Sequence, residues 1–152
     1  MNMTMSKTRS SAAAKAPPLA EDLRISITRL SRRLRGQGSS SLSVTQHAAL
    51  AAVERHQSMT PRDLAEHEKV QPPSMTRVIA ALEEQELLVR SPHPTDGRQV
   101  ILTVTDKGRE LLKEQRRRKQ AWLSQRLKEL TPEDRAILRQ AAPILEKLSR
   151  SS

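Results

Sequence analysis

The sequence predicts a mainly α-helical fold that contains one small β-hairpin. Apolar residues recur at helical spacing through most of the chain, and only the stretch around residues 87–104 changes to the alternation typical of strands. Aromatic residues are nearly absent, with one Trp and no Phe or Tyr, so the core must consist of aliphatic side chains and Met. This composition suits helix-on-helix packing better than a β-sandwich or barrel.

Start and stop signals place four helices in the first part of the chain. Ser43 and Gln46 form a capping box, and Thr60 followed by Pro61 is a second start signal. A proline pair opens the next helix, since proline fits the first turn of a helix but not its interior. The predicted helices span residues 20–36, 44–56, 61–68 and 72–86.

The predicted hairpin follows directly, and two more helices complete the chain. Its strands are Leu87–Ser91 and Gln99–Val104, and the helices cover residues 106–129 and 132–149, with a kink expected at Pro143. This order is that of a winged helix-turn-helix lobe between long terminal helices. Those helices have apolar faces and no sheet to cover them, which predicts a homodimer. The expected division is a flexible basic N-terminal arm (1–18), a dimerisation helix and loop (19–42), the winged lobe (43–105) and C-terminal dimerisation helices (106–152).

The formal net charge of +10 favours a polyanionic partner, because each neutralised phosphate releases condensed counterions. A solvated basic surface is the alternative. There is no cysteine, which excludes disulfides and Cys-ligated zinc. The first residues have no apolar core typical of a signal peptide, and no run is long enough to span a membrane. We therefore expect a cytoplasmic protein without a membrane partner.

The first candidate site is the start of the helix predicted at 72–86. In a helix-turn-helix unit, the second helix enters the major groove of double-stranded DNA and contacts base edges with its N-terminal residues. Ser and Thr hydroxyls can bond bases or phosphates, and Arg can contact guanine with two hydrogen bonds. The alternative is an ordinary amphipathic helix with a solvated arginine. The residues concerned are Pro73, Ser74, Thr76 and Arg77.

The second candidate site is the hairpin loop. Gly97 is expected to supply the positive φ of the reversal, and Arg98 is placed to reach a minor groove, whose negative potential attracts guanidinium. Asp96 is expected to orient Arg98, or Arg90 on the opposite strand. A plain turn, in which Asp and Gly are common for backbone reasons, is the alternative.

Several of these segments together resemble the MarR family of bacterial regulators. The resemblance implies a triangular dimer, major-groove contacts by Ser74, Thr76 and Arg77, and a wing pair of Asp96 and Arg98. It also implies a small-molecule effector, often a phenolic or other lipophilic anion, bound between the dimer helices and the lobe. The pair Pro72 and Pro73 departs from the family, because many members have Ser- or Asn-type capping residues there. The matching segments are residues 72–79, 82–83, 87–90, 96–98 and 102–108.

These observations predict a sequence-specific transcription regulator, a repressor that binds a pseudo-palindromic operator. The resemblance implies that a small-molecule effector releases it from that operator. The alternative is a winged-helix architectural or protein-interaction module that binds DNA without sequence preference. No catalytic motif is present, so neither an enzyme nor a cofactor is expected. The four histidines lack the i, i+4 spacing of metal ligands, and the basic run at residues 116–119 is interpreted as the solvated face of a helix.

Overall fold

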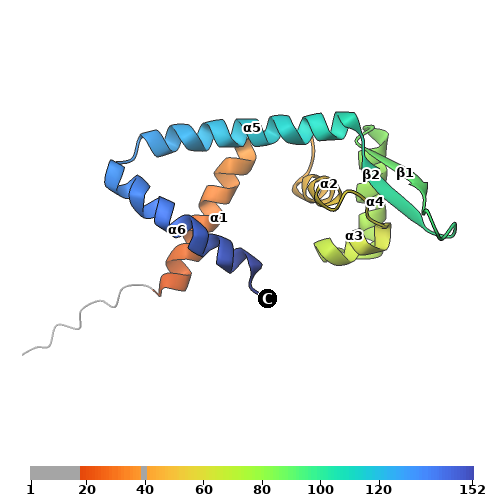
Figure 1. Ribbon diagram of the computed structural model, residues 1–152, viewed down its shortest axis with the longest axis horizontal. Coiled ribbons are helices and arrows are strands. Elements are labelled where there is room, and N and C mark those ends of the chain that lie inside the picture. The colour runs from red at the N-terminus through yellow and green to blue at the C-terminus, as the bar shows by residue number, and fades with distance from the viewer. Residues whose placement is uncertain (1–17, 39–40) are drawn as a thin grey trace, which may run out of the picture. The chain divides into compact units, whose positions relative to one another are not determined.

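The computed structural model describes residues 18–38 and 41–152, and these form six helices and one two-stranded hairpin (Figure 1). The expected helices are confirmed, with ends that differ by no more than two residues. Most of α1 belongs to one structural unit, and residues from Leu34 onward form another. Most of the expected N-terminal arm lies outside the described residues. The elements are α1 (Leu19–Gln37), α2 (Val44–His56), α3 (Pro61–Glu68), α4 (Pro72–Glu84), β1 (Leu88–Pro92), β2 (Val100–Val104), α5 (Asp106–Lys128) and α6 (Pro132–Arg150).

Side-chain caps fix the starts of the helices as the sequence predicts. The Ser43 hydroxyl accepts a hydrogen bond from the Gln46 amide at 3.1 Å, and the Gln46 side chain accepts one from the Ser43 amide at 3.1 Å. This pair is a complete capping box for α2. Thr60 caps α3 and Thr131 caps α6, each accepting a backbone amide at 3.1 Å. These bonds satisfy amides that would otherwise lack an intrahelical partner.

The core of the winged lobe is built from aliphatic side chains and methionine. It joins α2, α3, α4, the hairpin and the start of α5, and it contains no Phe, Tyr or Trp. The predicted stripe of α4 is confirmed, because Met75, Ile79 and Leu82 are buried and Val78 packs against them. The other buried apolar residues are Ala49, Leu50, Ala52, Val53, Met59, Leu64, Ala65, Leu87, Leu88, Leu102, Val104 and Leu112.

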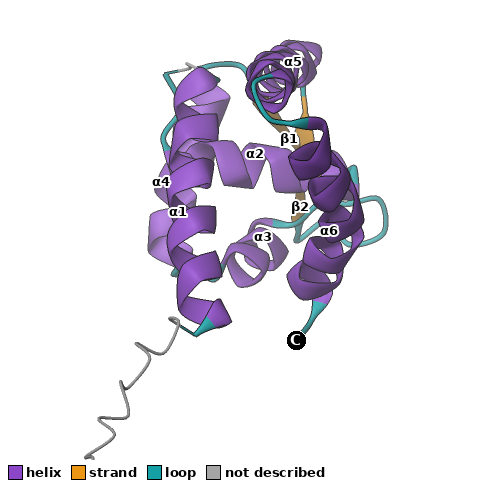
Figure 2. Cartoon of the chain, turned by 90° about the vertical axis from the view of Figure 1, so that its left-hand side faces the viewer, coloured by secondary structure: helices purple, strands orange, loops and turns teal. Residues whose placement is uncertain are grey.

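The hairpin, whose two strands are orange in Figure 2, pairs β1 with β2 in antiparallel register, from Leu88 opposite Val104 to Pro92 opposite Val100. Leu102 is buried, and its backbone also exchanges two hydrogen bonds with Met59, at 2.7 and 3.2 Å. This bridge ties the hairpin to the α2–α3 connection. The wing is therefore anchored to the core by backbone bonds as well as by side chains.

The end of α4 differs from the expected helix 72–86, because the helix stops at Glu84. Glu86 has a φ of 60°, which no right-handed helix can contain. The amide of Leu87 then donates to the Leu82 carbonyl at 2.9 Å and so closes the helix end. A glutamate at this left-handed position gave no sequence signal of a stop, since glycine is the usual residue there.

Glu86→Gly is expected to raise the free energy of unfolding by about 0.5–1 kcal/mol, because glycine adopts left-handed backbone without steric cost. Glycine also has more conformational freedom than glutamate in the unfolded chain, and this offsets only part of the gain in stability. Denaturant unfolding followed by far-UV circular dichroism measures the effect. Glu84→Gly, in the last turn of α4, should instead lower stability. Equal changes in both variants would contradict the backbone explanation.

The C-terminal helix α6 presents an apolar face that no other described residue covers. It contains no buried residue and runs without interruption through Pro143. The exposed large apolar residues of α6 are Ile137, Leu138, Ile144, Leu145 and Leu148.

In α5, the Arg126 guanidinium lies 5.8 Å from the centre of the Trp122 ring, the only Trp in the sequence. None of the helices in the described ranges combines the length and apolarity that a bilayer crossing requires.

Candidate nucleic-acid interface

The N-terminal half of α4 presents its polar side to solvent. The helix packs on α2 and α3 through the Met75–Ile79–Leu82 stripe, and this contact turns the opposite side outward. Because the buried stripe fixes the rotation of the helix, the direction of its polar side follows from the core. The four site residues predicted on this helix are all exposed: Pro73, Ser74, Thr76 and Arg77.

The exposed polar groups of α4 differ in how they are engaged. The Thr76 hydroxyl donates to the Pro72 carbonyl at 3.0 Å, which leaves its oxygen lone pairs free to accept. In the described part of the chain, neither the Ser74 hydroxyl nor the Arg77 guanidinium has a hydrogen-bond or ion-pair partner. Pro72 and Pro73 carry no N–H, so the helix start offers fewer free amides to an anion than an ordinary helix would.

The hairpin loop reverses the chain without a left-handed glycine, so the role expected for Gly97 is wrong. No described glycine has a positive φ. The reversal is spread over residues 93–99 and is closed by two backbone bonds, from the His93 amide to the Gln99 carbonyl at 3.1 Å and from the Gln99 amide to the Asp96 carbonyl at 3.0 Å. A longer loop needs no single residue of unusual conformation.

Within this loop, Asp96 acts on the backbone and not on an arginine side chain. Its carboxylate accepts a hydrogen bond from the Arg98 amide at 3.1 Å, which is an Asx-type turn. The His93 ring nitrogen Nδ1 accepts from the amide of Asp96 at 3.1 Å and from that of Thr95 at 3.2 Å. Sequence reasoning missed this role of His93. The Arg98 side chain is exposed and has no polar partner among the described residues.

Arg90 is held by α4, which corrects the expectation that Asp96 orients it. Its Nε atom lies 2.7 Å from the Glu83 carboxylate, and both side chains are partly exposed. The bond joins the helix directly to the first strand of the wing. The sequence pattern could not predict this ion pair, because Glu83 belongs to a helix and Arg90 to a strand. No single periodicity relates two residues that lie on either side of a turn.

The basic run of α5 lies mostly on a solvated face, as predicted, and carboxylates offset part of its charge. Arg116 pairs with Glu54 of α2 at 2.7 Å. Arg117 and Arg118 both bond Glu114, and these bonds, Arg117's first, lower the pKa of that carboxyl group to about 2. Ion pairs of this kind on an exposed helix contribute little to stability.

The histidines form one close pair. The rings of His56 and His67 meet edge to face with centroids 4.9 Å apart. His67 Nδ1 also lies 3.2 Å from the carboxylate of the neighbouring Glu68. In residues 18–38 and 41–152, no group of three or more potential ligands is placed to hold a metal ion.

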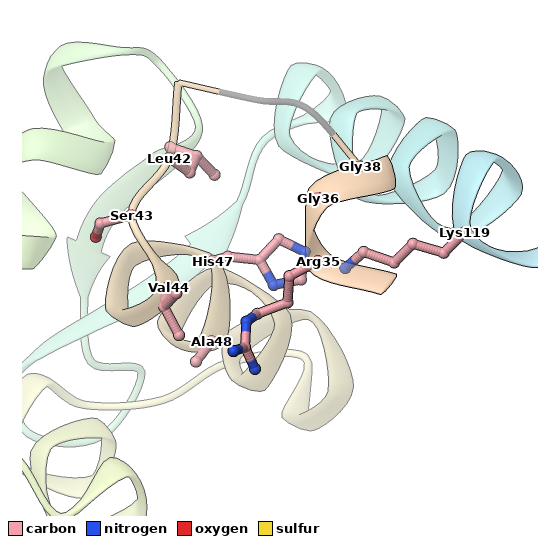
Figure 3. A pocket seen from close by; sticks show the side chains of 9 residues that line it. All are labelled: Arg35, Gly36, Gly38, Leu42, Ser43, Val44, His47, Ala48 and Lys119. Carbon is pink, nitrogen blue, oxygen red and sulfur yellow. The ribbon is translucent and has the colours of Figure 1, made fainter. Parts of the chain in front are cut away.

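A cavity of about 500 Å³ lies between the end of α1, the start of α2 and the middle of α5 (Figure 3). Its lining begins at Arg35, near the end of α1, and reaches α5 only at Lys119. Burial, and then the charge of Lys119, lower the pKa of His47 below its usual value. The lining residues are Arg35, Gly36, Gly38, Leu42, Ser43, Val44, His47, Ala48 and Lys119.

The arrangement of α2, α3, α4 and the hairpin, with the polar side of α4 exposed, defines a winged helix-turn-helix protein. The family model described as MarR family matches residues 42–100. An uncharacterized HTH-type transcriptional regulator of Mycobacterium bovis is 48% identical over 128 residues, which cover 84% of this chain and 90% of that protein. The chain therefore belongs to the MarR family of HTH-type transcriptional regulators, which bind DNA and act as dimers.

Two further comparisons agree with this assignment. A putative transcriptional regulator of Pseudomonas aeruginosa has a crystal structure that superposes with a TM-score of 0.79 at 29% identity, covering 88% of this chain and 96% of that one. The HTH-type transcriptional repressor MdtR of Bacillus subtilis is 27% identical over 142 residues, 90% of each chain. The similarity thus extends beyond the winged lobe into the terminal helices.

Proposed function

We propose that this MarR-family regulator is a repressor that binds a pseudo-palindromic operator as a homodimer and is released from it by a small molecule. The observation that carries the proposal is the exposed polar side of α4, held outward by the buried stripe of the same helix. The similarity to MdtR, which is named a repressor, supports the direction of regulation.

In this proposal, α4 enters the major groove and Arg77 contacts a guanine edge, for which its unpaired guanidinium is suited. Ser74 and Thr76 bond bases or phosphates nearby, while Pro73 packs against the groove. Arg98 reaches the adjacent minor groove from the wing. Asp96 and Arg90 serve DNA binding indirectly, because the first shapes the loop and the second joins the wing to α4.

The homodimer is proposed from the apolar face of α6. Its large aliphatic side chains are 40–63% exposed, although they lie on one side of the helix. A contiguous apolar surface of this kind is typical of a subunit interface. Two lobes related by a two-fold axis would then read half-sites about 10 base pairs apart.

Arg77→Ala is expected to weaken operator binding by about tenfold to hundredfold for each half-site, because a two-bond contact to guanine contributes about 1–3 kcal/mol. Arg98→Ala should also weaken it, with the loss concentrated on sequences that have a narrow minor groove. Fluorescence anisotropy with a labelled palindrome from the chain's own promoter region measures both. Lys128→Ala, an exposed change in the last turn of α5, is the control.

The same titration separates sequence-specific from general binding. A repressor should bind the palindrome far more tightly than random duplexes at the same salt concentration. Equal affinity for both would favour the architectural module. Unchanged operator affinity in the Arg77 and Arg98 variants would refute the proposed contacts.

A further inference from the structure

The ring of His93 holds two backbone amides at the start of the hairpin loop. Its Nδ1 atom lies 3.1 Å from the amide nitrogen of Asp96 and 3.2 Å from that of Thr95, and the Thr95 hydroxyl lies 3.3 Å from the same atom. Pro94 has no N–H, so these are the first two amides after His93 that can donate. One side-chain nitrogen thus closes the first half of the loop, as the side chain of an Asn or Asp closes an Asx turn.

The bonds of His93 lead to Arg98 through Asp96. While the amide of Asp96 donates to His93, the carboxylate of Asp96 accepts from the Arg98 amide at 3.1 Å. The Asp96 carbonyl also accepts from the Gln99 amide at 3.0 Å. The Arg98 side chain is exposed and has no polar partner in the described ranges, so its direction depends on the backbone that carries it. That backbone is held by a chain of bonds that begins at His93.

This arrangement requires an unprotonated Nδ1. A backbone amide can only donate, so the nitrogen that it bonds must present a lone pair. The proton of the neutral His93 ring is therefore on Nε2, which has no polar partner within residues 18–38 and 41–152. In an imidazolium both ring nitrogens carry protons, and the Nδ1 proton would then point at two N–H groups. Protonation thus replaces an acceptor with a repulsive contact.

We propose that His93 is a positioning residue of the wing, which in its neutral form holds the loop so that Arg98 meets the minor groove and in its protonated form releases the loop. For its effect on DNA binding the inference rests on the proposed function, whereas the loop bonds themselves need no DNA. In this role His93 does not touch DNA. Operator affinity should then fall as the pH is lowered from about 7.5 to about 5.5, a range in which imidazoles take up protons.

The sign of the pH effect distinguishes this role from a direct contact. An imidazolium paired with a phosphate would strengthen operator binding at low pH, because it adds a positive charge to the interface. The loop itself contains one charge of each sign, on Asp96 and Arg98, and neither can supply the lost lone pair on Nδ1. Further charged groups lie on α3, around a hollow that Gln99 and Val100 also line, and on β1. They are Arg62, Asp63 and Glu66 of α3 and Arg90 of β1, which is paired with Glu83.

Fluorescence anisotropy with the labelled operator at constant salt tests the proposal. The wild-type chain should lose about threefold to tenfold in affinity between pH 7.5 and 5.5, typical of a lost hydrogen bond. Asparagine places its side-chain oxygen about where Nδ1 lies and does not titrate in this range. His93→Asn should therefore bind like wild type at pH 7.5 and lose most of the pH dependence. Because the other three histidines are present in both chains, the difference between the two profiles isolates His93.

His93→Gln is the matched control, because glutamine carries its amide group near the position of Nε2 and offers no acceptor at that of Nδ1. It should weaken operator binding by about threefold to tenfold at both pH values. In an Arg98→Ala background the same change should cost less than about twofold, since His93 acts through Arg98.

Nuclear magnetic resonance of the free, ¹⁵N-labelled full chain gives a second measurement that does not depend on DNA. The ring nitrogens of His93 should show the tautomer with the proton on Nε2. The amide signals of Thr95 and Asp96 should shift together with the protonation of the ring, because both amides donate to it.

Four results would overturn the inference: wild-type affinity that rises at low pH relative to His93→Asn, equal affinity of His93→Gln and wild type, a cost of His93→Gln that persists without the Arg98 side chain, or an Nδ1–H tautomer in the free chain. Operator binding that depends on Arg98 but not on His93 refutes this inference alone. A wild-type chain that binds no operator at any pH refutes the proposed function, while the tautomer and the two amide signals still decide whether His93 holds the loop.

Discussion

Ile144→Glu is expected to convert the protein to monomers and to weaken binding to a two-half-site operator by about a hundredfold or more. Ile144 is 59% exposed on the apolar face of α6, so a glutamate is tolerated in the single chain. In the proposed dimer it would bury an unpaired charge, which is strongly unfavourable. Losing the second half-site removes the avidity of two linked contacts. Light scattering after size-exclusion chromatography measures the mass, and anisotropy measures DNA binding.

The control for this variant is Arg139→Glu, which introduces the same residue on the opposite face of α6. Helical geometry places position 139 about 140° away from Ile144. It should leave the dimer and operator binding nearly unchanged. A dimer that survives Ile144→Glu, or that Arg139→Glu disrupts equally, would remove the apolar face of α6 from the interface.

Gly108→Ala is expected to lower the free energy of unfolding by about 2–3 kcal/mol, because the added methyl group has no space. The position of its carbon lies 2.5 Å from the Leu87 carbonyl oxygen and 2.6 Å from Val104. The carbonyl is backbone and is itself bonded to the Thr105 amide at 3.0 Å, so it cannot move freely. Denaturant unfolding followed by far-UV circular dichroism measures the loss.

Gly97→Ala is the matched control for this steric argument. No atom lies within 4 Å of the place where its side chain would begin, and its φ is not positive. We expect a change of no more than about 0.5 kcal/mol, typical of an exposed substitution. A large loss of stability in Gly97→Ala, or none in Gly108→Ala, would show that the lack of space around Gly108 is not what destabilises the Gly108→Ala variant.

Capping and periodicity made most of the fold predictable. The prolines at positions 61, 72 and 132 fix where helices begin, and the stripe from Met75 to Leu82 fixes which side of α4 is buried. The end of α4 could not be placed, because Glu86 takes a backbone conformation that its side chain disfavours. Local rules favour a continuing helix at such a residue, and only the packing of Leu87 overrides them.

The exposure of the candidate interface residues was predictable from the sequence, but the partners of their side chains were not. The exposure of Arg77 and Arg98 follows from helix and hairpin geometry. The Glu83–Arg90 ion pair depends on how α4 meets β1, which neither sequence period encodes. The backbone bond of Asp96 is local to the loop and corresponds to the plain turn given as the alternative. The cavity likewise joins Arg35, His47 and Lys119 from three helices, and their sequence spacing carries no signal of that proximity.

The aliphatic core has a consequence for spectroscopy. Because Trp122 is the sole indole and the chain has no phenol, tryptophan fluorescence and near-ultraviolet absorption originate in α5 alone. Loss of packing in the winged lobe would therefore leave both signals almost unchanged. Conversely, a shift in emission on adding ligand or operator would report a change in the surroundings of one known side chain, because the chain has no second Trp and no Tyr.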